Sequence, residues 1–279
     1  MVPSPGPGRR VRDVVGTGYW VMASFSAHEP YYRHDLALIH HLGFGFHADA
    51  CAPGIIDLLA PIRARDGLVV EIGCGSGLLT RHLLEAGHRV IATDASDAML
   101  DLARRYAPGA QDIRRLRLPD DVVPPADAIV SVGHVLNYLE DQASVDRALA
   151  ALADALRPRG VLAIDLCDLA WGRAREHAPP HIRRDDQWVL MTEYSLPSPN
   201  CFVREMTTFV ENPDGSWRRD DERHDNVLVD ASRVPAVLHD HGVDASIASG
   251  FGSEELMVGL VAVLGHRPAQ GQDPVSGPH

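Results

Sequence analysis

The chain has 279 residues, a formal net charge of −12 and 45% hydrophobic residues, which suits one large globular domain or one domain with an elaboration. The acidic balance disfavours a broad nucleic-acid-binding surface, and no apolar run approaches the length of a membrane span. The absence of lysine excludes a P-loop lysine and a pyridoxal Schiff base. Four scattered cysteines and fifteen histidines follow no metal-ligand spacing, and the N-terminus lacks the apolar core of a signal peptide. We expect a cytoplasmic protein with reduced thiols and no metal.

The first part of the chain is predicted to be a tail followed by a helical cap. Residues 1–18 are rich in Pro, Gly and polar residues and are predicted to be flexible. Residues 19–66 show apolar side chains at helical spacing, first near residues 36–42 and again at 55–59. We expect this cap to lead into the core of the domain.

A glycine-rich loop follows the first predicted strand. The strand at 68–72 runs into Gly73, Gly75 and Gly77, and a helix is predicted at 78–86. Glycine is favoured where the backbone takes positive φ and where a ligand lies directly against the main chain. The next strand, 90–93, ends at Asp94, a carboxylate suited to holding the two hydroxyls of a ribose. The pattern predicts a nucleotide-cofactor site.

Strands and helices then continue to alternate. Helices are predicted at 98–106 and 144–156, and strands near 113–118, at 128–132 and at 161–166. Such alternation is typical of a parallel, doubly wound sheet. We therefore predict an α/β, Rossmann-like core over residues 67–168.

Beyond residue 168 the pattern changes to alternating apolar and polar residues. Strands are predicted at 188–194, 202–210 and 217–229, with a hairpin turn at 212–215, so residues 169–230 are predicted to form an antiparallel insert. Arg204, Arg218 and His224 lie in this insert, but the run 218–225 mixes both charges and is interpreted as a solvated strand face. A helix at 232–241 and strands at 243–247 and 256–264 complete the sheet within residues 231–266. Residues 267–279 are predicted to be a second flexible tail.

The cofactor half of the chain resembles a known family. Glu71 followed by Gly73, Gly75 and Gly77, with Asp94 after the next strand, resembles motif I and its acidic follower in the class I S-adenosylmethionine-dependent methyltransferases. The dinucleotide fingerprint Gly-x-Gly-x-x-Gly is not matched, because residue 78 is leucine. The resemblance implies a seven-stranded sheet with S-adenosylmethionine as cofactor. An insert between the fifth strand and the last helix is similar to the small-molecule N-methyltransferases that act on amino sugars.

The same resemblance implies which residues bind the cofactor. These are Glu71, Gly73, Cys74, Gly75, Gly77, Asp94, Ala95, Met99 and Gly133, with Asp120 or Asp121. Asp94 is expected to hold the ribose, with a helix N-cap as the alternative, and Met99 either flanks the adenine or packs in the core. Three aspartates compete for the adenine amino group, and Asp112 is the least favoured because it precedes the predicted strand.

Two residues are candidates for the chemical step. His134 follows the carboxyl end of the strand at 128–132, where open α/β sheets place ligands. We interpret it either as a base that removes a proton from the acceptor or as packing against the cofactor. Tyr31 and Tyr32 resemble the family's lid tyrosines, which close over the methionine end of the cofactor. Burial in the cap is the alternative, and for Tyr32 it is the favoured one.

The predicted function is S-adenosylmethionine-dependent methyl transfer to a nitrogen, or an oxygen, of a small molecule, as in natural-product biosynthesis. The predicted partner is a small-molecule acceptor, with no nucleic acid and no membrane, and the insert could form either a lid or a homodimer surface. Two alternatives remain at this stage. An NAD-dependent oxidoreductase shares the strand, loop and distal acid, and a catalytically silent S-adenosylmethionine-binding protein shares the whole fold.

Overall fold

The computed structural model describes residues 31–269. The predicted tail 1–18, the start of the cap and residues 270–279 of the second predicted tail lie outside this range. Within it, no helix is long and apolar enough to cross a membrane.

The central element is a seven-stranded sheet in the order β10-β11-β5-β4-β1-β2-β3. Its strands are β1 Leu68–Ile72, β2 Arg89–Asp94, β3 Asp112–Arg115, β4 Ala126–Ser131, β5 Leu156–Cys167, β10 Asp244–Ala248 and β11 Leu260–His266. The first five run parallel, and β11 is antiparallel to both β5 and β10. The predicted fold class is confirmed, including the reversed terminal strands.

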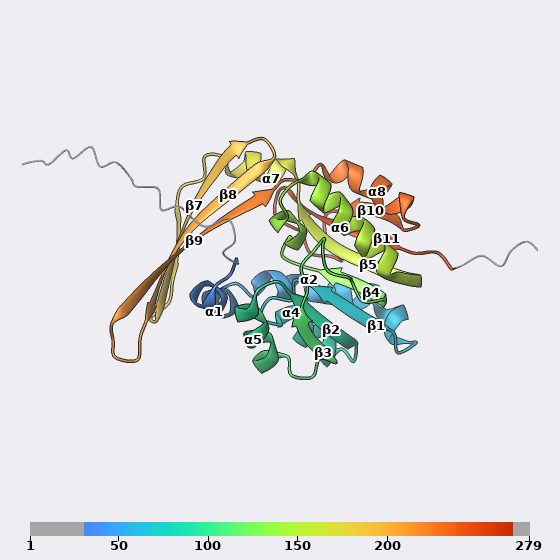
Figure 1. The fold of residues 1–279 in the computed structure, drawn as a ribbon, viewed down its shortest axis with the longest axis horizontal. Helices are drawn as coiled ribbons and strands as arrows, with labels where there is room; N and C mark the ends of the chain where they lie inside the picture. The colour runs from blue at the N-terminus through green and yellow to red at the C-terminus, as the bar shows by residue number, and fades with distance from the viewer. Residues whose placement is uncertain (1–30, 270–279) are drawn as a thin grey trace, which may run out of the picture.

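Helices cover this sheet, and three of them form the cap (Figure 1). The cap consists of α1 His34–Gly43, α2 Phe46–Leu58 and α3 Ala60–Arg63. The remaining helical elements are α4 Leu78–Glu85, α5 Asp97–Tyr106, α6 Gln142–Ala155, α7 Leu169–Arg175 and α8 Val234–Asp240, with short 3₁₀ turns η1 Val135–Tyr138 and η2 Ala231–Arg233.

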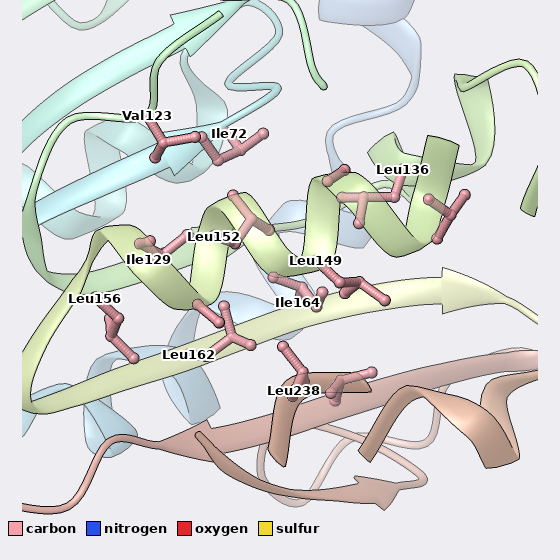
Figure 2. Close-up of a cluster of buried hydrophobic side chains, with 14 of the residues drawn as sticks. Ile72, Val123, Ile129, Leu136, Leu149, Leu152, Leu156, Leu162, Ile164 and Leu238 are labelled. Atoms are coloured by element: carbon pink, nitrogen blue, oxygen red, sulfur yellow. The ribbon is translucent and has the colours of Figure 1, made fainter. Parts of the chain in front are cut away.

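Helix α6 shows how sequence pattern becomes a core. The Asp141 side chain caps its N-terminus by accepting from the Ser144 backbone N–H at 2.7 Å. Its apolar side chains recur every three or four residues and pack on β4 and β5, where Leu149 and Leu152 face Ile129, Leu162 and Ile164 (Figure 2). These side chains are fully buried, so the core on this face is continuous across the sheet.

A second, antiparallel sheet in the order β6-β7-β8-β9 stands beside the core (Figure 1). Its strands are β6 His181–Arg184, β7 Trp188–Ser198, β8 Cys201–Glu211 and β9 Trp217–Val227. Helix α1 lies between the two parts: Leu36 and Ile39 pack on this sheet, while Ala37 packs on Met99 of α5. The cap therefore joins the insert to the core.

Two elements were missed in the sequence, and several boundaries move. Helix α7, capped by Asp168, is only seven residues long and contains a glycine, so its periodicity is short. Strand β6 is a charged edge strand without an alternating pattern. Strand β3 ends at Arg115 and not at residue 118, and β5 begins at Leu156, where α6 was predicted to end.

Leu152→Ala is expected to lower the free energy of unfolding by about 2–5 kcal/mol, because it leaves a cavity in a fully buried position. The control is Val122→Ala, at a side chain that is 90% exposed, which should change it by less than about 0.5 kcal/mol. Urea denaturation of both variants checks this. Equal midpoints for the two variants would contradict the assignment of α6 to the core.

Candidate functional site

The three glycines of the loop after β1 all take positive φ, at 67°, 54° and 85°. The atoms that a side chain would meet differ among the three positions. A Cβ on Gly73 would lie 2.3 Å from Val135 Cγ2, and one on Gly77 would lie 3.0 Å from Ala107 Cβ, so these two permit close packing within the protein. A Cβ on Gly75 would meet only the Met99 sulfur, at 3.9 Å. Gly75 is thus the glycine that leaves room for a ligand.

Asp94 fixes this loop against the end of β2. Its carboxylate accepts the Gly75 backbone N–H and the Ser96 backbone N–H, each at 2.8 Å. Burial raises the pKa of Asp94, against the lowering effect of these hydrogen bonds. The N-cap of α5 is Ser96, whose hydroxyl accepts from Met99, so the N-cap alternative for Asp94 is wrong.

A cavity of ≈ 720 Å³ opens beside this carboxylate, within the range of small-molecule sites. One end is formed by the core: Gly73, Gly75, residues 94–96, Met99, residues 116–118 and Asp120. The other end is formed by residues 31–33 and His40 of the cap, with Glu222, Arg223 and Asp225 of β9. The segment after β4 also contributes to the lining, through Val132, Gly133, Val135, Leu136, Tyr138 and Leu139.

Several predicted cofactor residues lie in this lining and three lie behind it. Ala95, Met99 and Gly133 line the cavity, as do Gly73 and Gly75. Glu71, Cys74 and Gly77 do not. They support the loop from the protein side, where Cys74 is buried in an apolar cluster.

Glu71 is a buried carboxyl group that accepts from the Thr80 hydroxyl at 2.6 Å. Burial raises its pKa from 4.5 to about 8, and the hydrogen bond from Thr80 offsets part of that effect. At neutral pH Glu71 is therefore largely protonated and can itself donate a hydrogen bond.

The three competing aspartates separate clearly. Asp120 lines the cavity. Asp121 does not, because it turns back to accept the Arg117 backbone N–H at 2.7 Å. Asp112 is the first residue of β3 and pairs with Arg114 on the same strand. The placement leaves Asp120 as the candidate for the adenine contact.

His134 is not among the residues that line the cavity. It occupies the left-handed region at φ 50°, which turns its ring away onto Tyr138 and Trp171, each with centroids 5.8 Å apart. Burial, and then the Arg204 guanidinium, lower the pKa of His134 to about 3. Such a weak base in this position does not support the predicted removal of a proton from the acceptor.

The turn that carries His134 is held by a buried acid. Asp165 of β5 is fully buried and accepts the backbone N–H groups of Gly133 and His134, at 2.9 and 2.6 Å, and His47 Nε2 lies 2.8 Å from the same carboxylate. This arrangement sets the position of Gly133, whose own Cβ position is open on the cavity side.

The predicted lid tyrosines both line the cavity, and they are held differently. Tyr31 packs against the rings of His224 and Tyr138 at 4.6 and 5.3 Å. The Tyr32 hydroxyl lies 2.8 Å from the Tyr138 hydroxyl, and its backbone carbonyl accepts from Ser96 at 2.8 Å. Tyr32 is thus both packed in the cap and exposed to the cavity.

Sequence reasoning missed Glu222. Its carboxylate is 4% exposed, lines the cavity and accepts the backbone N–H groups of Tyr32 and Arg33, both at 2.8 Å. Burial raises its pKa to about 7. The run 218–225 is not a uniformly solvated face, because every second residue from Glu222 to Asn226 points inward. All five side chains from Glu222 to Asn226 are polar, however, so the sequence shows no alternation of apolar and polar residues that could have revealed this.

No group of acidic, histidine and cysteine side chains suited to a metal ion occurs among residues 31–269.

Comparisons with known proteins agree with this geometry. Residues 70–162 match a protein-family model described as a methyltransferase domain. The dTDP-3-amino-3,4,6-trideoxy-alpha-D-glucopyranose N,N-dimethyltransferase of Streptomyces venezuelae is 24% identical over 82% of this chain and 97% of its own length. Three other curated relatives named as methyltransferases are matched over only 39–65% of their length.

Two solved structures show the same fold. The sugar N-methyltransferase KedS8 from Streptoalloteichus has a TM-score of 0.70 at 20% identity, covering 90% of this chain and all of its own. CalS10, an amino pentose methyltransferase from Micromonospora solved with S-adenosylmethionine bound, has a TM-score of 0.61 at 18% identity, covering 85% and 98%. The predicted methyltransferase domain is matched over residues 70–162, and these solved structures share the predicted fold.

Glu71→Gln is expected to remove a pH dependence of stability. Because folding raises the pKa of Glu71 from 4.5 to about 8, wild-type stability falls relative to the variant as the pH rises through that window. The slope of the difference is at most roughly 1.4 kcal/mol per pH unit. Urea denaturation at four pH values between 5 and 8 measures it.

The control for this series is Glu85→Gln, which removes an exposed glutamate from the adjoining helix α4. Its stability should follow the wild-type curve. Parallel curves for wild type and Glu71→Gln would contradict the buried, protonated state of Glu71.

Proposed function

We propose that the chain transfers a methyl group from S-adenosylmethionine to a nitrogen of a small molecule, with an oxygen as the second choice. The observation that carries this proposal is one cavity with two chemically different ends. Its core end has the features of a nucleoside site, and its other end is built from aromatic and acidic side chains of the cap and insert. The names of the amino-sugar relatives support nitrogen.

The core end fits the cofactor. Gly75 and Gly133 offer backbone without a Cβ on the cavity side, and the Asp94 carboxylate retains acceptor capacity for two hydroxyls. Ala95 and Met99 provide an apolar wall suited to a purine. When bound, S-adenosylmethionine supplies an electrophilic methyl group on a sulfonium. The residues named here hold and orient it, and orientation in a dry site is the main requirement for a direct displacement.

The other end, which we call the acceptor end, fits a protonated amine. Tyr31, Tyr138 and Glu222 line this part of the cavity, and both aromatic rings and a carboxylate attract a cation. A carboxyl group whose pKa is about 7 can take up the proton that an ammonium must lose before its lone pair reacts. Glu222 therefore replaces His134 as our candidate proton acceptor.

The direct test is formation of S-adenosylhomocysteine from S-adenosylmethionine with a panel of amino sugars and amino acids, each paired with the analogue in which a hydroxyl replaces the amine. Turnover with the amines alone supports nitrogen as the acceptor, and turnover with the hydroxyl analogues alone would overturn it. The same reactions with Glu222→Gln should show a loss of turnover without a matching loss of cofactor affinity.

Asp94→Ala is expected to weaken binding of S-adenosylhomocysteine at least tenfold, or about 1.4 kcal/mol, because the ribose loses its acceptor. Asp121→Ala removes a nearby carboxylate that only accepts the Arg117 N–H, and it should bind as wild type does. Isothermal titration calorimetry measures both, with NAD titrated in parallel. Preference for NAD over the adenosyl ligands would reject the proposed cofactor.

Gly133→Ala tests whether the ligand lies against this wall. Its φ is 98° and its Cβ would meet no atom within 4 Å, so the new methyl group would stand in the cavity. Gly215→Ala, in the hairpin turn with φ 81° and an equally open Cβ position, carries a similar backbone strain of about 1–3 kcal/mol away from the site. We expect S-adenosylhomocysteine affinity to fall only in Gly133→Ala; equal affinities would place the cofactor elsewhere.

A further inference from the structure

The guanidinium group of Arg204 lies beside Tyr138, behind the end of the cavity that the cap and the insert form. Arg204 of β8 makes no ion pair with any carboxylate among residues 31–269. It donates through Nη2 to the Tyr138 hydroxyl, and its guanidinium lies 5.5 Å from the centre of the Tyr138 ring. Its Nε is buried and has no partner in the described part of the chain. Burying a cation in this position costs free energy unless an anionic group or a strong hydrogen-bond acceptor compensates its charge.

The neighbouring histidines cannot compensate the charge of Arg204. Burial, and then the Arg204 guanidinium, lower the pKa of His40 to about 4 and that of His224 to about 2. These rings are therefore neutral at pH 7, and the positive charge stays on Arg204. Like Arg204 Nε, the Nδ1 atoms of His40, His134 and His224 are buried without a partner among the described residues.

The two tyrosines beside Arg204, Tyr32 and Tyr138, have one hydroxyl proton that their mutual hydrogen bond does not use. Arginine only donates, so the Tyr138 oxygen accepts from Arg204. The hydrogen bond between the hydroxyls of Tyr32 and Tyr138 uses one of their two protons, whichever of them donates. Both side chains line the cavity, so the remaining proton is available to an acceptor inside it.

We propose that Tyr32, Tyr138 and Arg204 form a subsite for an anionic oxygen, a carboxylate or phosphate, of the ligand that fills the acceptor end of the cavity. Tyr32 and Tyr138 make the direct contact, and Arg204 supplies the charge through Tyr138. The subsite rests on the proposed function for its position, since the nucleoside is taken to occupy the Asp94 end. The anionic oxygen belongs either to the amino-acid part of the cofactor or to the methyl acceptor.

Counting protons predicts an unusual mutational pattern. In Tyr32→Phe the Tyr138 proton is released from its partner and can serve the ligand, so the affinity should stay within about threefold, or roughly 0.7 kcal/mol, of wild type. The double variant Tyr32→Phe, Tyr138→Phe has no hydroxyl left and should lose at least tenfold. The control is Tyr194→Phe, which removes a tyrosine hydroxyl of β7 whose ring stacks on Phe202, outside the cavity.

Calorimetry with three kinds of probe separates the sources of the anion. If the double variant binds S-adenosylhomocysteine tenfold more weakly but binds 5′-methylthioadenosine, which lacks the amino-acid part, as the wild type does, the subsite holds the cofactor carboxylate. If the double variant binds both adenosyl ligands as the wild type does, but its complex with S-adenosylhomocysteine binds acetate or inorganic phosphate tenfold more weakly, the subsite holds an anionic oxygen of the methyl acceptor. Thermal melting of each variant checks that it is folded.

The proposal is overturned if the double variant and Tyr194→Phe bind every probe alike, or if Tyr32→Phe alone abolishes the effect. Failure of the proposed function gives a different result. In that case neither adenosyl ligand binds the wild-type protein, and titration of the free protein and the double variant with acetate and phosphate still decides whether the subsite exists.

Discussion

The carboxylate of Glu222 joins the two segments, one from the cap and one from the insert, that form one end of the cavity. It accepts the backbone N–H groups of Tyr32 and Arg33 at 2.8 Å, and so ties the start of α1 to the inner face of β9. These two donors precede the helix and have no intrahelical partner, so the buried acid satisfies groups that would otherwise be left open. Because Tyr31 and Tyr32 line the cavity, this contact helps to fix the position of its wall.

Asp165 performs the same physical task for the segment after β4. It is fully buried, and the backbone N–H groups of Gly133 and His134 stabilise it, so the turn after β4 is fixed from below. Buried carboxylates are costly when unpaired and rigid when fully hydrogen-bonded. The shape of the cavity thus depends on two acids, one in the core and one in the insert, and each positions backbone that faces the ligand.

The sequence predicted the placement of the residues around Gly75 and Asp94 better than that of the residues around Glu222, for a physical reason. Gly75 and Asp94 are adjacent to strands whose pattern is clear, and backbone geometry alone brings them together. The position of Glu222 depends instead on which face of an edge strand turns toward α1, a tertiary choice that a mixed-charge run does not reveal. For similar reasons Asp120 and Asp121 could not be separated, and the left-handed conformation that turns His134 away could not be foreseen.

The overall charge of the chain says little about the charge inside the site. A net charge of −12 favours attraction of a cationic molecule at long range, but that field is screened within about 10 Å at 0.1 M salt. Within the site, nearby charged groups set the electrostatic potential. Glu222 lines one part of the acceptor end, and the Arg204 guanidinium lies next to Tyr138, which lines another part. Amine recognition at the first and oxyanion recognition at the second are therefore compatible. An acceptor that carries both an amine and an acidic oxygen would satisfy both walls, whereas a simple amine would leave the Arg204 side to the carboxylate of the cofactor.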